Sequence, residues 1–395
     1  MRHNQSTLKA STVQAHAQRL LLAELELRDY RPGLPAGLVV SLLLLAGLWQ
    51  TSLSAACALV KDPPCREAAR KAALALLPRR PRDLLGRLLR ALRQTLPDHL
   101  RRLPQVMAVD LHQRPFHGKK NTRGSTRRQK KAGTRTSFTY ATLAALTRWG
   151  RFTVGLLPTR PRMRLTTIVK GLLAQAREAG LSAAHLLLDK EFYAAEVVDL
   201  LQKEGIAFLM PAEKKAATRH LYDPKTPVGW YEYGWTAALR RYDPGRKKRR
   251  PKGELTVRVR GCVARHRKTG EPLVYATWGL VGWSPLQVAE GYRRRFGIEA
   301  SYRQLGQCLA RTSSRNERYR LVLVGIALLL CNLWAYLHSE LFSSGKLCET
   351  RLQLWRMRLP QLRAAVAAEV AALFGGYVSE WPTQRPVPPE LGHET

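Results

Sequence analysis

Three acidic side chains occupy positions in which they could bind metal ions together. Asp110 lies near the end of one apolar run, Asp189 ends another, and Glu299 stands inside a long helical segment. Hard divalent cations take oxygen ligands, so their sites require carboxylates that separate elements bring together. Two such ions about 3.5 to 4 Å apart activate an attacking oxygen and stabilise a leaving oxygen at one phosphorus atom. The three carboxylates therefore predict metal-assisted cleavage and transfer of phosphodiester bonds.

Glu299 shares a predicted helical face with three further polar residues, because successive spacings of three, four and four residues separate the members of this set. The others are Tyr292, Arg295 and Arg303. Arginine and tyrosine side chains beside a metal-binding carboxylate could bind a phosphate group of the substrate. An amphipathic surface helix with ion pairs along it has the same spacing, so the pattern alone leaves both interpretations open.

The elements that must position Asp110 and Asp189 follow an informative order. Short β-like runs and helical stretches between residues 105 and 211 give the order βββαβαβ, which matches a ribonuclease-H-like α/β fold. If the first and fourth strands are neighbours, both carboxylates emerge at the same edge of the sheet. The predicted strands are residues 106–111, 137–143, 152–157, 184–188 and 207–210, and the predicted helices are 166–178 and 194–204. A basic loop is expected at 119–131.

The pattern of apolar, basic and turn residues divides the rest of the chain into predicted domains. Ser284, Pro285 and Gln287 form a helix start with a capping box, and this helix carries Glu299. A possible helix-turn-helix at 50–76, with basic residues on its second helix, competes with an ordinary helical hairpin. The predicted domains are an all-helical N-terminal DNA-binding domain (1–104), the ribonuclease-H-like core (105–211 and 284–340), a β-rich insertion (212–283), a C-terminal helical region (341–375) and a disordered tail (376–395).

The charge of the chain indicates a polyanionic partner. The formal net charge is +37, from 66 basic and 29 acidic side chains. Lysine and arginine clusters gain free energy on nucleic acid by releasing counterions. Phosphate contact is therefore expected of the basic runs around Arg127 and at the tip of a hairpin in the insertion. The predicted DNA-binding residues in these runs are Lys130, Lys131, Arg246, Lys247, Lys248, Arg249 and Arg250.

Other site types fit the sequence less well. The six cysteines show no paired two-residue spacing, which argues against a zinc ribbon or a disulfide framework and fits a reducing cytosol. His112 and His117 follow the first carboxylate by two and seven residues, but a hard-metal reaction disfavours zinc there. Two apolar stretches, 37–60 and 321–337, are interpreted as core helices rather than membrane spans, and no membrane partner is expected.

The region of the third carboxylate resembles a known family. The stretch from Gly291 to Arg303, with Arg311-Thr-Ser-Ser314 and a long apolar helix ending at Trp334, resembles insertion-sequence-four-like DDE transposases, closest to the halobacterial H-three branch. The family signature is Tyr, two residues, Arg, three residues, Glu, six residues, Lys. Tyr292, Arg295 and Glu299 match this signature. Gly306 stands at the lysine position, where Arg303 is a possible substitute.

The first two carboxylates also match this family. Residues 109–118 resemble its first motif and residues 188–193 its second, so the resemblance covers about 105–337. It implies a transposase of a bacterial or archaeal insertion sequence that cuts and joins DNA with Asp110, Asp189 and Glu299 on two Mg²⁺ ions, for which Mn²⁺ can substitute. The implied partners are double-stranded DNA, as terminal inverted repeats and target, and a second copy in a homodimeric synaptic complex. The implied location is the cytoplasm, with the nucleoid.

Alternatives remain open at this point. An enzyme with the same fold could be a nuclease that carries out no strand transfer. A catalytically decayed, basic DNA-binding protein would keep the same charge pattern, and the glycine at position 306 bears on that possibility.

Overall fold

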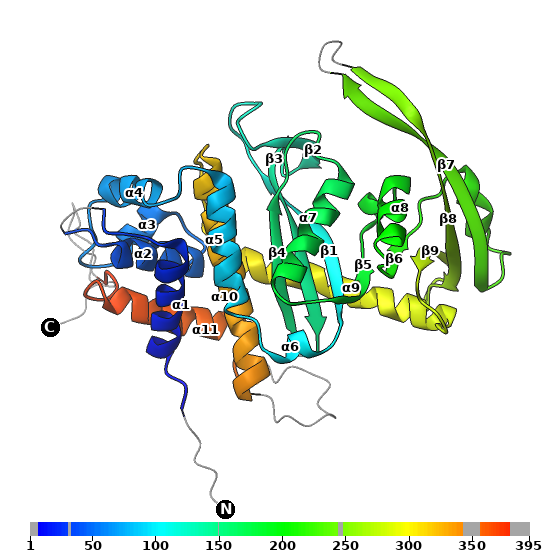
Figure 1. Cartoon of the computed structure of the whole chain (residues 1–395). Coiled ribbons are helices and arrows are strands. Elements are labelled where there is room, and N and C mark those ends of the chain that lie inside the picture. The colour runs from blue at the N-terminus through cyan, green and yellow to red at the C-terminus, as the bar shows by residue number, and fades with distance from the viewer. Residues whose placement is uncertain (1–6, 31–32, 149, 244–247, 343–355, 380–395) are drawn as a thin grey trace, which may run out of the picture.

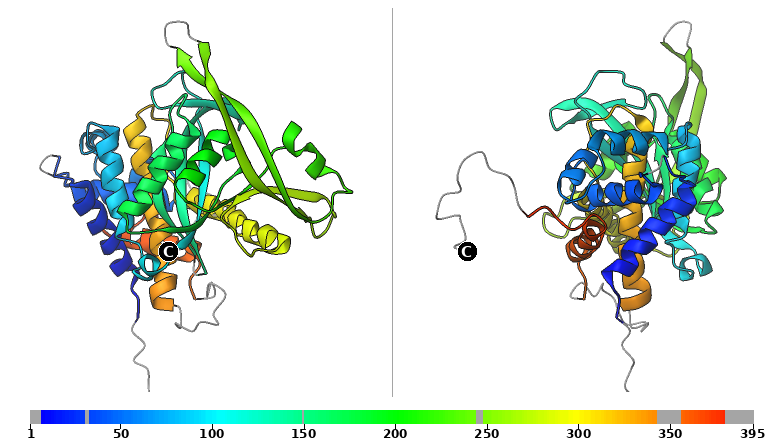
Figure 2. Two further views of the ribbon diagram at one scale, coloured as in Figure 1. Left: turned by 45° about the vertical axis from the view of Figure 1, so that its right-hand side comes forward. Right: turned by 90° about the vertical axis from the view of Figure 1, so that its left-hand side faces the viewer.

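The computed structural model describes residues 7–30, 33–148, 150–243, 248–342 and 356–379. The chain has a mixed α/β fold. One mixed β-sheet stands in the middle of the view, a group of helices packs at one end of it, and a long two-stranded ribbon projects at the other (Figure 1). The ribbon leaves the rest of the molecule in both further views (Figure 2).

The helical group combines segments from both ends of the chain. Its helices share one apolar core, in which the residues of α2 and α10 are buried along almost their whole length. Among the described residues, the helices before the sheet are α1 (Ala10–Leu25), α2 (Ala36–Leu48), α3 (Leu53–Ala58), α4 (Arg66–Ala75), α5 (Pro81–Arg93) and α6 (His99–Arg102). The two that follow it are α10 (Glu317–Leu337) and α11 (Leu359–Ala372). The domain boundary at 104 stays a prediction, since this core extends to both later helices.

α10 is the central helix of this core. In the described part of the chain, Glu317–Phe342 is one helical stretch that is long and apolar enough to cross a membrane, and 89% of its most apolar window is buried inside the protein. Its buried Asn332 donates to the Thr95 hydroxyl and the Thr153 carbonyl and accepts from the Thr153 amide at 2.8 Å. These bonds fasten α10 to β4 and to the end of α5. The expectation of a core helix for 321–337 is confirmed by this burial.

The sheet has the strand order β2-β3-β1-β5-β6-β9-β8-β7, and β4 pairs with β3 as well. β1, β5 and β6 run parallel to one another, and the other pairs are antiparallel. The strands are β1 (Gln105–Pro115), β2 (Thr126–Lys131), β3 (Thr134–Thr147), β4 (Gly150–Pro158), β5 (Ala183–Leu187), β6 (Phe208–Pro211), β7 (Gly229–Asp243), β8 (Lys248–Arg265) and β9 (Pro272–Trp278).

Helices cover both faces of the central strands. α7 (Leu165–Glu178) and α8 (Ala195–Lys203) pack on one face, and α9 (Pro285–Gln307) crosses behind the sheet in Figure 1. Because side chains alternate along a strand, Met107 and Val109 of β1 face α7, whereas Ala108 faces α9. Residues at even positions of β1 near Ala108 therefore share the face that α9 covers. Short helical turns are η1 (Lys190–Phe192), η2 (Ala216–Tyr222) and η3 (His338–Phe342).

The predicted elements between 105 and 211 all have counterparts in the structure, with shifted ends. The predicted start of α9 is also confirmed: the Ser284 hydroxyl accepts from the Gln287 amide, and the Gln287 side chain accepts from the Ser284 amide at 2.7 Å. In the predicted insertion, β9 lies between β6 and β8, so the β-rich segment continues the central sheet.

Two expectations need correction. Residues 126–131, expected in a basic loop, form strand β2, because Ala132 and Gly133 make a tight turn with positive φ at both positions, which suits a hairpin. Basic side chains are compatible with an edge strand. Of the tail expected to be disordered, Tyr377 bridges to Val60 and accepts a hydrogen bond from the Trp49 indole at 2.9 Å. Residues 380–395 lie outside the described part of the chain.

Candidate active site

Parallel pairing of β1 and β5 brings Asp110 and Asp189 together. Ala108 lies opposite Leu187 in the register of the two strands, and each aspartate stands two residues further along its own strand direction. Asp189 begins the turn η1, where its Oδ1 accepts from the Lys190 amide at 2.6 Å. Asp110 Oδ1 accepts from the Leu111 amide at 2.8 Å. The predicted meeting of these two carboxylates at one sheet edge is thus present in the structure.

Arg295 of α9 lies between the two carboxylates. Its Nη2 is 2.9 Å from Asp189 Oδ2 and 3.8 Å from Asp110 Oδ1. The Arg295 side chain is 7% exposed, against 36% for Asp189 and 14% for Asp110. The guanidinium reaches this position because Val288 and Tyr292, earlier on α9, pack against the sheet face. The candidate site therefore consists of two carboxylates and one buried cation from three separate elements.

The environment of Asp110 disfavours its charged form. Burial raises the pKa of its carboxyl to about 6; the Arg295 guanidinium and the Leu111 amide oppose this shift, and the negative charges of Asp189 and Glu191 add to it. A poorly solvated group of carboxylates is one that an additional cation would stabilise.

Tyr292 on α9 packs beside Asp189 and contacts the backbone next to it. Its hydroxyl donates to the Leu188 carbonyl at 3.4 Å, next to Asp189, and its ring lies 5.2 Å from the Tyr275 ring. Burial raises the pKa of this phenol, so it keeps the proton that it donates. The predicted contact of Tyr292 with DNA stays a prediction, and in this structure the side chain is 6% exposed.

Glu299 and Arg303 follow Arg295 by one and two helical turns on α9. The helical backbone places Glu299 on the same face as Arg295, but its side chain lies outside the described side chains. Arg303 is exposed. Among the side chains that are described, no group of three histidine, cysteine, aspartate or glutamate residues is close enough to hold a metal ion. Two of the three predicted oxygen ligands therefore meet, and the third is placed by its helix alone.

The histidines of the first motif are set differently from each other. His112 is on β1, and burial lowers its pKa to about 3, so it is neutral at physiological pH. His117 is exposed beyond the end of the strand. Neither belongs to a described group that could hold a metal ion.

Those predicted basic contacts whose backbone the structure describes lie at the ends of two hairpins. Lys131 is exposed at the end of β2. The side chain of Lys130 lies outside the described part of the structure. The same holds for the side chains of Lys248, Arg249 and Arg250, whose backbone pairs with the last residues of β7. Arg246 and Lys247 fall outside the described residues. The DNA contacts of these residues stay predictions.

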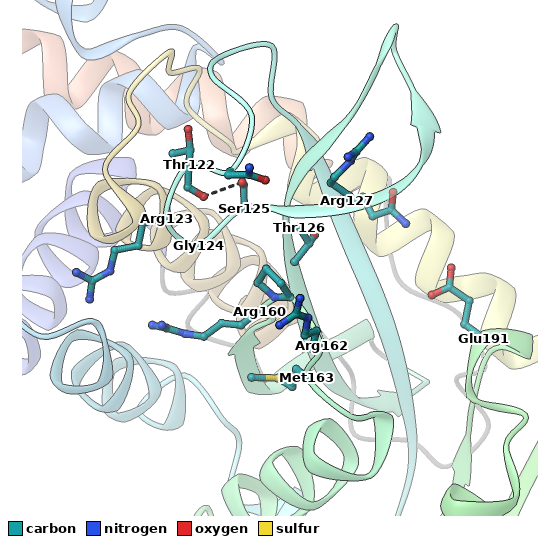
Figure 3. Close-up of a pocket in the computed structure, with 13 residues that line it drawn as sticks. Thr122, Arg123, Gly124, Ser125, Thr126, Arg127, Arg160, Arg162, Met163 and Glu191 are labelled. Carbon is teal, nitrogen blue, oxygen red and sulfur yellow. Dashed lines mark hydrogen bonds between the residues drawn. The ribbon is translucent and has the colours of Figure 1, made fainter. Parts of the chain in front are cut away.

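Sequence reasoning missed part of a basic pocket next to the candidate site. The pocket has a volume of about 630 Å³ and is lined by four arginines (Figure 3). Arg123 and Arg127 belong to the basic segment 119–131 that the sequence indicated, whereas Arg160 and Arg162 do not. A signal was present in Arg160-Pro-Arg162, two arginines in the short loop before α7.

Comparisons with known proteins identify a family and a similar fold. Residues 101–334 match a family model described as the transposase DDE domain, and this span contains all three predicted carboxylates. Among solved structures, the chain is similar to a cryo-EM structure of the piggyBac transposase synaptic complex with hairpin DNA, with a TM-score of 0.56 and 10% sequence identity. The similarity covers 95% of this chain and 82% of that one. No curated protein matches the chain.

Proposed function

The chain belongs to the DDE transposase family, and on this premise we propose that it cuts the ends of an insertion sequence and joins them to target DNA through Asp110, Asp189 and Glu299. The observation that carries the proposal is the convergence of Asp110 and Asp189 at one sheet edge, with Arg295 beside both. Family membership makes the chain a DNA-transposing enzyme.

The core of the enzyme is proposed to be ribonuclease-H-like, and the helices of residues 1–104 to bind the ends. Support for the core comes from the order β4-β3-β1-β5-β6, in which the first three strands are antiparallel neighbours and the last three are parallel neighbours. α7 and α8 cover one face of these strands, and α9 returns across the other. The contact of Arg295 on α9 with both aspartates supports the assignment of Glu299, one turn later, to the same site.

Two Mg²⁺ ions, or Mn²⁺ in their place, are the cofactors that we propose. The donor set fits them, because hard divalent cations take carboxylate oxygens and Asp110 lies where added positive charge would relieve its desolvation. Asp110, Asp189 and Glu299 would hold the ions, which activate the attacking oxygen and stabilise the leaving oxygen when bound. Arg295 would orient Asp189 and offer its remaining donors to a phosphate.

The partners that we propose are the two terminal inverted repeats, target DNA and a second copy of the chain in a synaptic complex. The charge of +37 supports a DNA partner. The similar piggyBac structure is itself a synaptic complex with hairpin DNA. Within the family, we favour the insertion-sequence-four-like branch, because Tyr292, Arg295 and Glu299 match its signature. The chain would then come from a bacterial or archaeal element and act in the cytoplasm, at the nucleoid.

The test uses purified protein and a DNA fragment that carries the gene with its native flanks. We expect Mg²⁺- or Mn²⁺-dependent cuts at the ends of the element and transfer of those ends into a second plasmid. Asp189→Asn and Glu299→Gln should abolish both reactions. Asp199→Asn on α8 and Glu290→Gln on α9 make the same chemical changes away from the site, and they should cut as wild type does.

Each other outcome has a distinct meaning. Cutting without transfer would identify a nuclease of the same fold. Specific binding of the ends without cutting would identify a decayed protein, to which the glycine at position 306 would then be relevant. Cutting that survives both site substitutions would refute the assignment of the carboxylates.

A further inference from the structure

The basic pocket beside the candidate site is built from two segments that are distant in the sequence. Arg123 and Arg127 come from the end of the β1–β2 loop and the start of β2, and Arg160 and Arg162 come from the β4–α7 loop (Figure 3). All four arginines are exposed. Glu191 is the one acidic residue among the described residues that line the pocket. The pocket therefore concentrates positive charge in a concave surface of about 630 Å³.

Glu317, the first residue of α10, holds the two pocket segments in place. Its Oε1 is 2.9 Å from Arg123 Nε and its Oε2 is 3.6 Å from Arg160 Nη2. Gly124 makes this approach possible, because a Cβ atom there would lie 2.8 Å from Glu317 Oε2, and its φ is +83°. The loop is closed further by the Ser125 hydroxyl, which donates to the Thr122 carbonyl at 2.7 Å (Figure 3). The arginines thus stand on segments that are fixed before any ligand arrives.

The backbone of the second segment is also unusual. Arg162 has a φ of +65°, a left-handed conformation that is uncommon for a residue with a side chain. The Met163 amide donates to the Arg160 carbonyl and closes the turn around it at 3.1 Å. Backbone strain of this kind is concentrated at binding sites, where the surrounding structure maintains it. Here it turns Arg162 toward the same pocket as Arg160.

The pocket lies close to the candidate catalytic carboxylates. Gln113, which lines it, is three residues after Asp110 on β1 and, as an odd position, belongs to the other face of that strand, and Glu191 is two residues after Asp189. Three residues of strand span about 10 Å. Successive phosphates of one strand in a DNA duplex advance by about 3.4 Å along the axis. The pairing with β5 ends at Ala108 and Leu187, so a DNA strand that is cut at Asp110 and passes over this end of β5 to the other face of β1 would reach the pocket about three nucleotides away.

We propose that this pocket binds backbone phosphates of the cleaved DNA strand about three nucleotides from the bond that is cut. This inference rests on the proposed function, and it adds a binding site to it. Arginine is suited to the role, because its planar guanidinium donates two parallel hydrogen bonds to a phosphate. Contacts of this kind position DNA without reading its sequence. The pocket would set the register of the strand across the sheet edge.

The experiment measures binding alone, in EDTA, by fluorescence anisotropy. The probes are duplexes copied from the DNA that flanks the gene, each with one neutral methylphosphonate in place of a phosphate. The variants are Arg160→Gln combined with Arg162→Gln, and Arg127→Gln from the other segment. Arg164→Gln is the matched control for Arg127→Gln, because it removes one positive charge from a residue next to the pocket that does not line it. Circular dichroism and melting temperature check that each variant folds.

We expect the double variant to bind unmodified duplex at least about tenfold more weakly than wild type, with a salt dependence whose slope is smaller by about 2. One methylphosphonate should weaken wild-type binding but have little further effect on the double variant, whereas Arg164→Gln should respond as wild type does. This coupling at one phosphate would support the pocket. Equal weakening of wild type and double variant by the methylphosphonate at every position would overturn it.

Cutting with Mg²⁺ is scored separately, so the two proposals fail separately. Coupling without metal-dependent cutting would support the pocket and refute the proposed function. Cutting without coupling would support the proposed function and refute the pocket. Where both occur, the coupled phosphate should lie two to four nucleotides from the mapped cut, and a coupled position more than about ten nucleotides away would refute the placement.

Discussion

Replacement of Arg295 by glutamine tests the arrangement of the candidate site directly. The change removes the cation that lies 2.9 Å from Asp189 and 3.8 Å from Asp110 and leaves the two carboxylates to repel each other. Removal of one member of a buried ion pair costs about 3 to 5 kcal/mol. Asp189 is 36% exposed, so solvent compensates part of this loss. We therefore expect Arg295→Gln to lower the free energy of unfolding by about 2 to 3 kcal/mol in the absence of metal.

The expected change is measurable by calorimetry or fluorescence in EDTA at pH 7. Unfolding entropies of about 2.1 cal/mol/K per residue convert 2.5 kcal/mol into a fall in melting temperature of about 3 °C for a chain of this length. Arg303→Gln, an exposed arginine two turns later on the same helix, is the matched control and should change stability by less than about 0.5 kcal/mol. Asp110→Asn added to Arg295→Gln should restore part of the loss, because it removes one of the two repelling charges.

The result that would refute this reasoning is equally specific. If Arg295→Gln melts within about 1 °C of wild type, while Arg303→Gln does the same, the guanidinium does not hold the carboxylates together. Equal destabilisation by both variants would point to helix α9 itself rather than to the ion pair. A double variant that is less stable than Arg295→Gln alone would contradict the repulsion on which the argument depends.

Three further predictions concern single positions. The folded pKa of Asp110 is about 6 and its unfolded pKa is about 4, so the folded state binds the extra proton between these values and stability falls as pH rises through them. In EDTA, the free energy of unfolding of Asp110→Asn relative to wild type should therefore rise by up to about 3 kcal/mol between pH 4 and pH 7. If thermal unfolding shows the same difference between the two proteins at both pH values, the prediction is contradicted. Gly306→Lys should fold as stably as wild type, since a Cβ atom there meets nothing within 4 Å, and should raise DNA cleavage if the signature lysine contributes to it; a stable variant with unchanged cleavage would show that it does not. Asn332→Leu should lose about 3 kcal/mol in urea unfolding, because Thr95 and both backbone groups of Thr153 lose a buried partner, and a loss below about 1 kcal/mol would contradict that role.

The sequence was informative where local pattern and physical constraint coincide. The strand before Asp189 is a short apolar run between breakers, which is typical of a central strand covered on both faces. Once that strand is the parallel neighbour of β1, the shared register brings Asp110 and Asp189 to one edge without further information. The capping box at Ser284 likewise depends on local residues alone, and the structure contains it.

The same residues could not reveal where Arg295 would point. Its spacing from Glu299 predicted a shared helical face but not the crossing of α9 over the sheet, which depends on the packing of that helix against Ala108, Leu187 and Leu209. From the sequence, Arg295 was a contact for phosphate. In the folded chain it is an ion-pair partner of both aspartates, because tertiary packing places it within reach of them.

The arginine pocket could not be predicted from the sequence, also because it depends on tertiary packing. Arg123 and Arg160 are 37 positions apart, and each stands in a segment with ordinary turn residues. What joins them is Glu317, which lies more than 150 residues after Arg160 and reads in the sequence as the first residue of an apolar helix. No periodicity connects three such positions.

The course of α10 links the pocket to the helical core. Its first residue, Glu317, holds the two arginine segments, and Asn332, four turns later, bonds to Thr153 of β4 and to Thr95 at the end of α5. Between these ends its side chains are buried among the N-terminal helices. A buried helix fastened at both ends transmits displacement instead of absorbing it. If the N-terminal helices bind the element's ends as proposed, α10 would therefore keep the bound DNA, the arginine pocket and the two aspartates in one fixed spacing, and loosening it through Asn332→Leu should blur the position of the cut as well as lower stability.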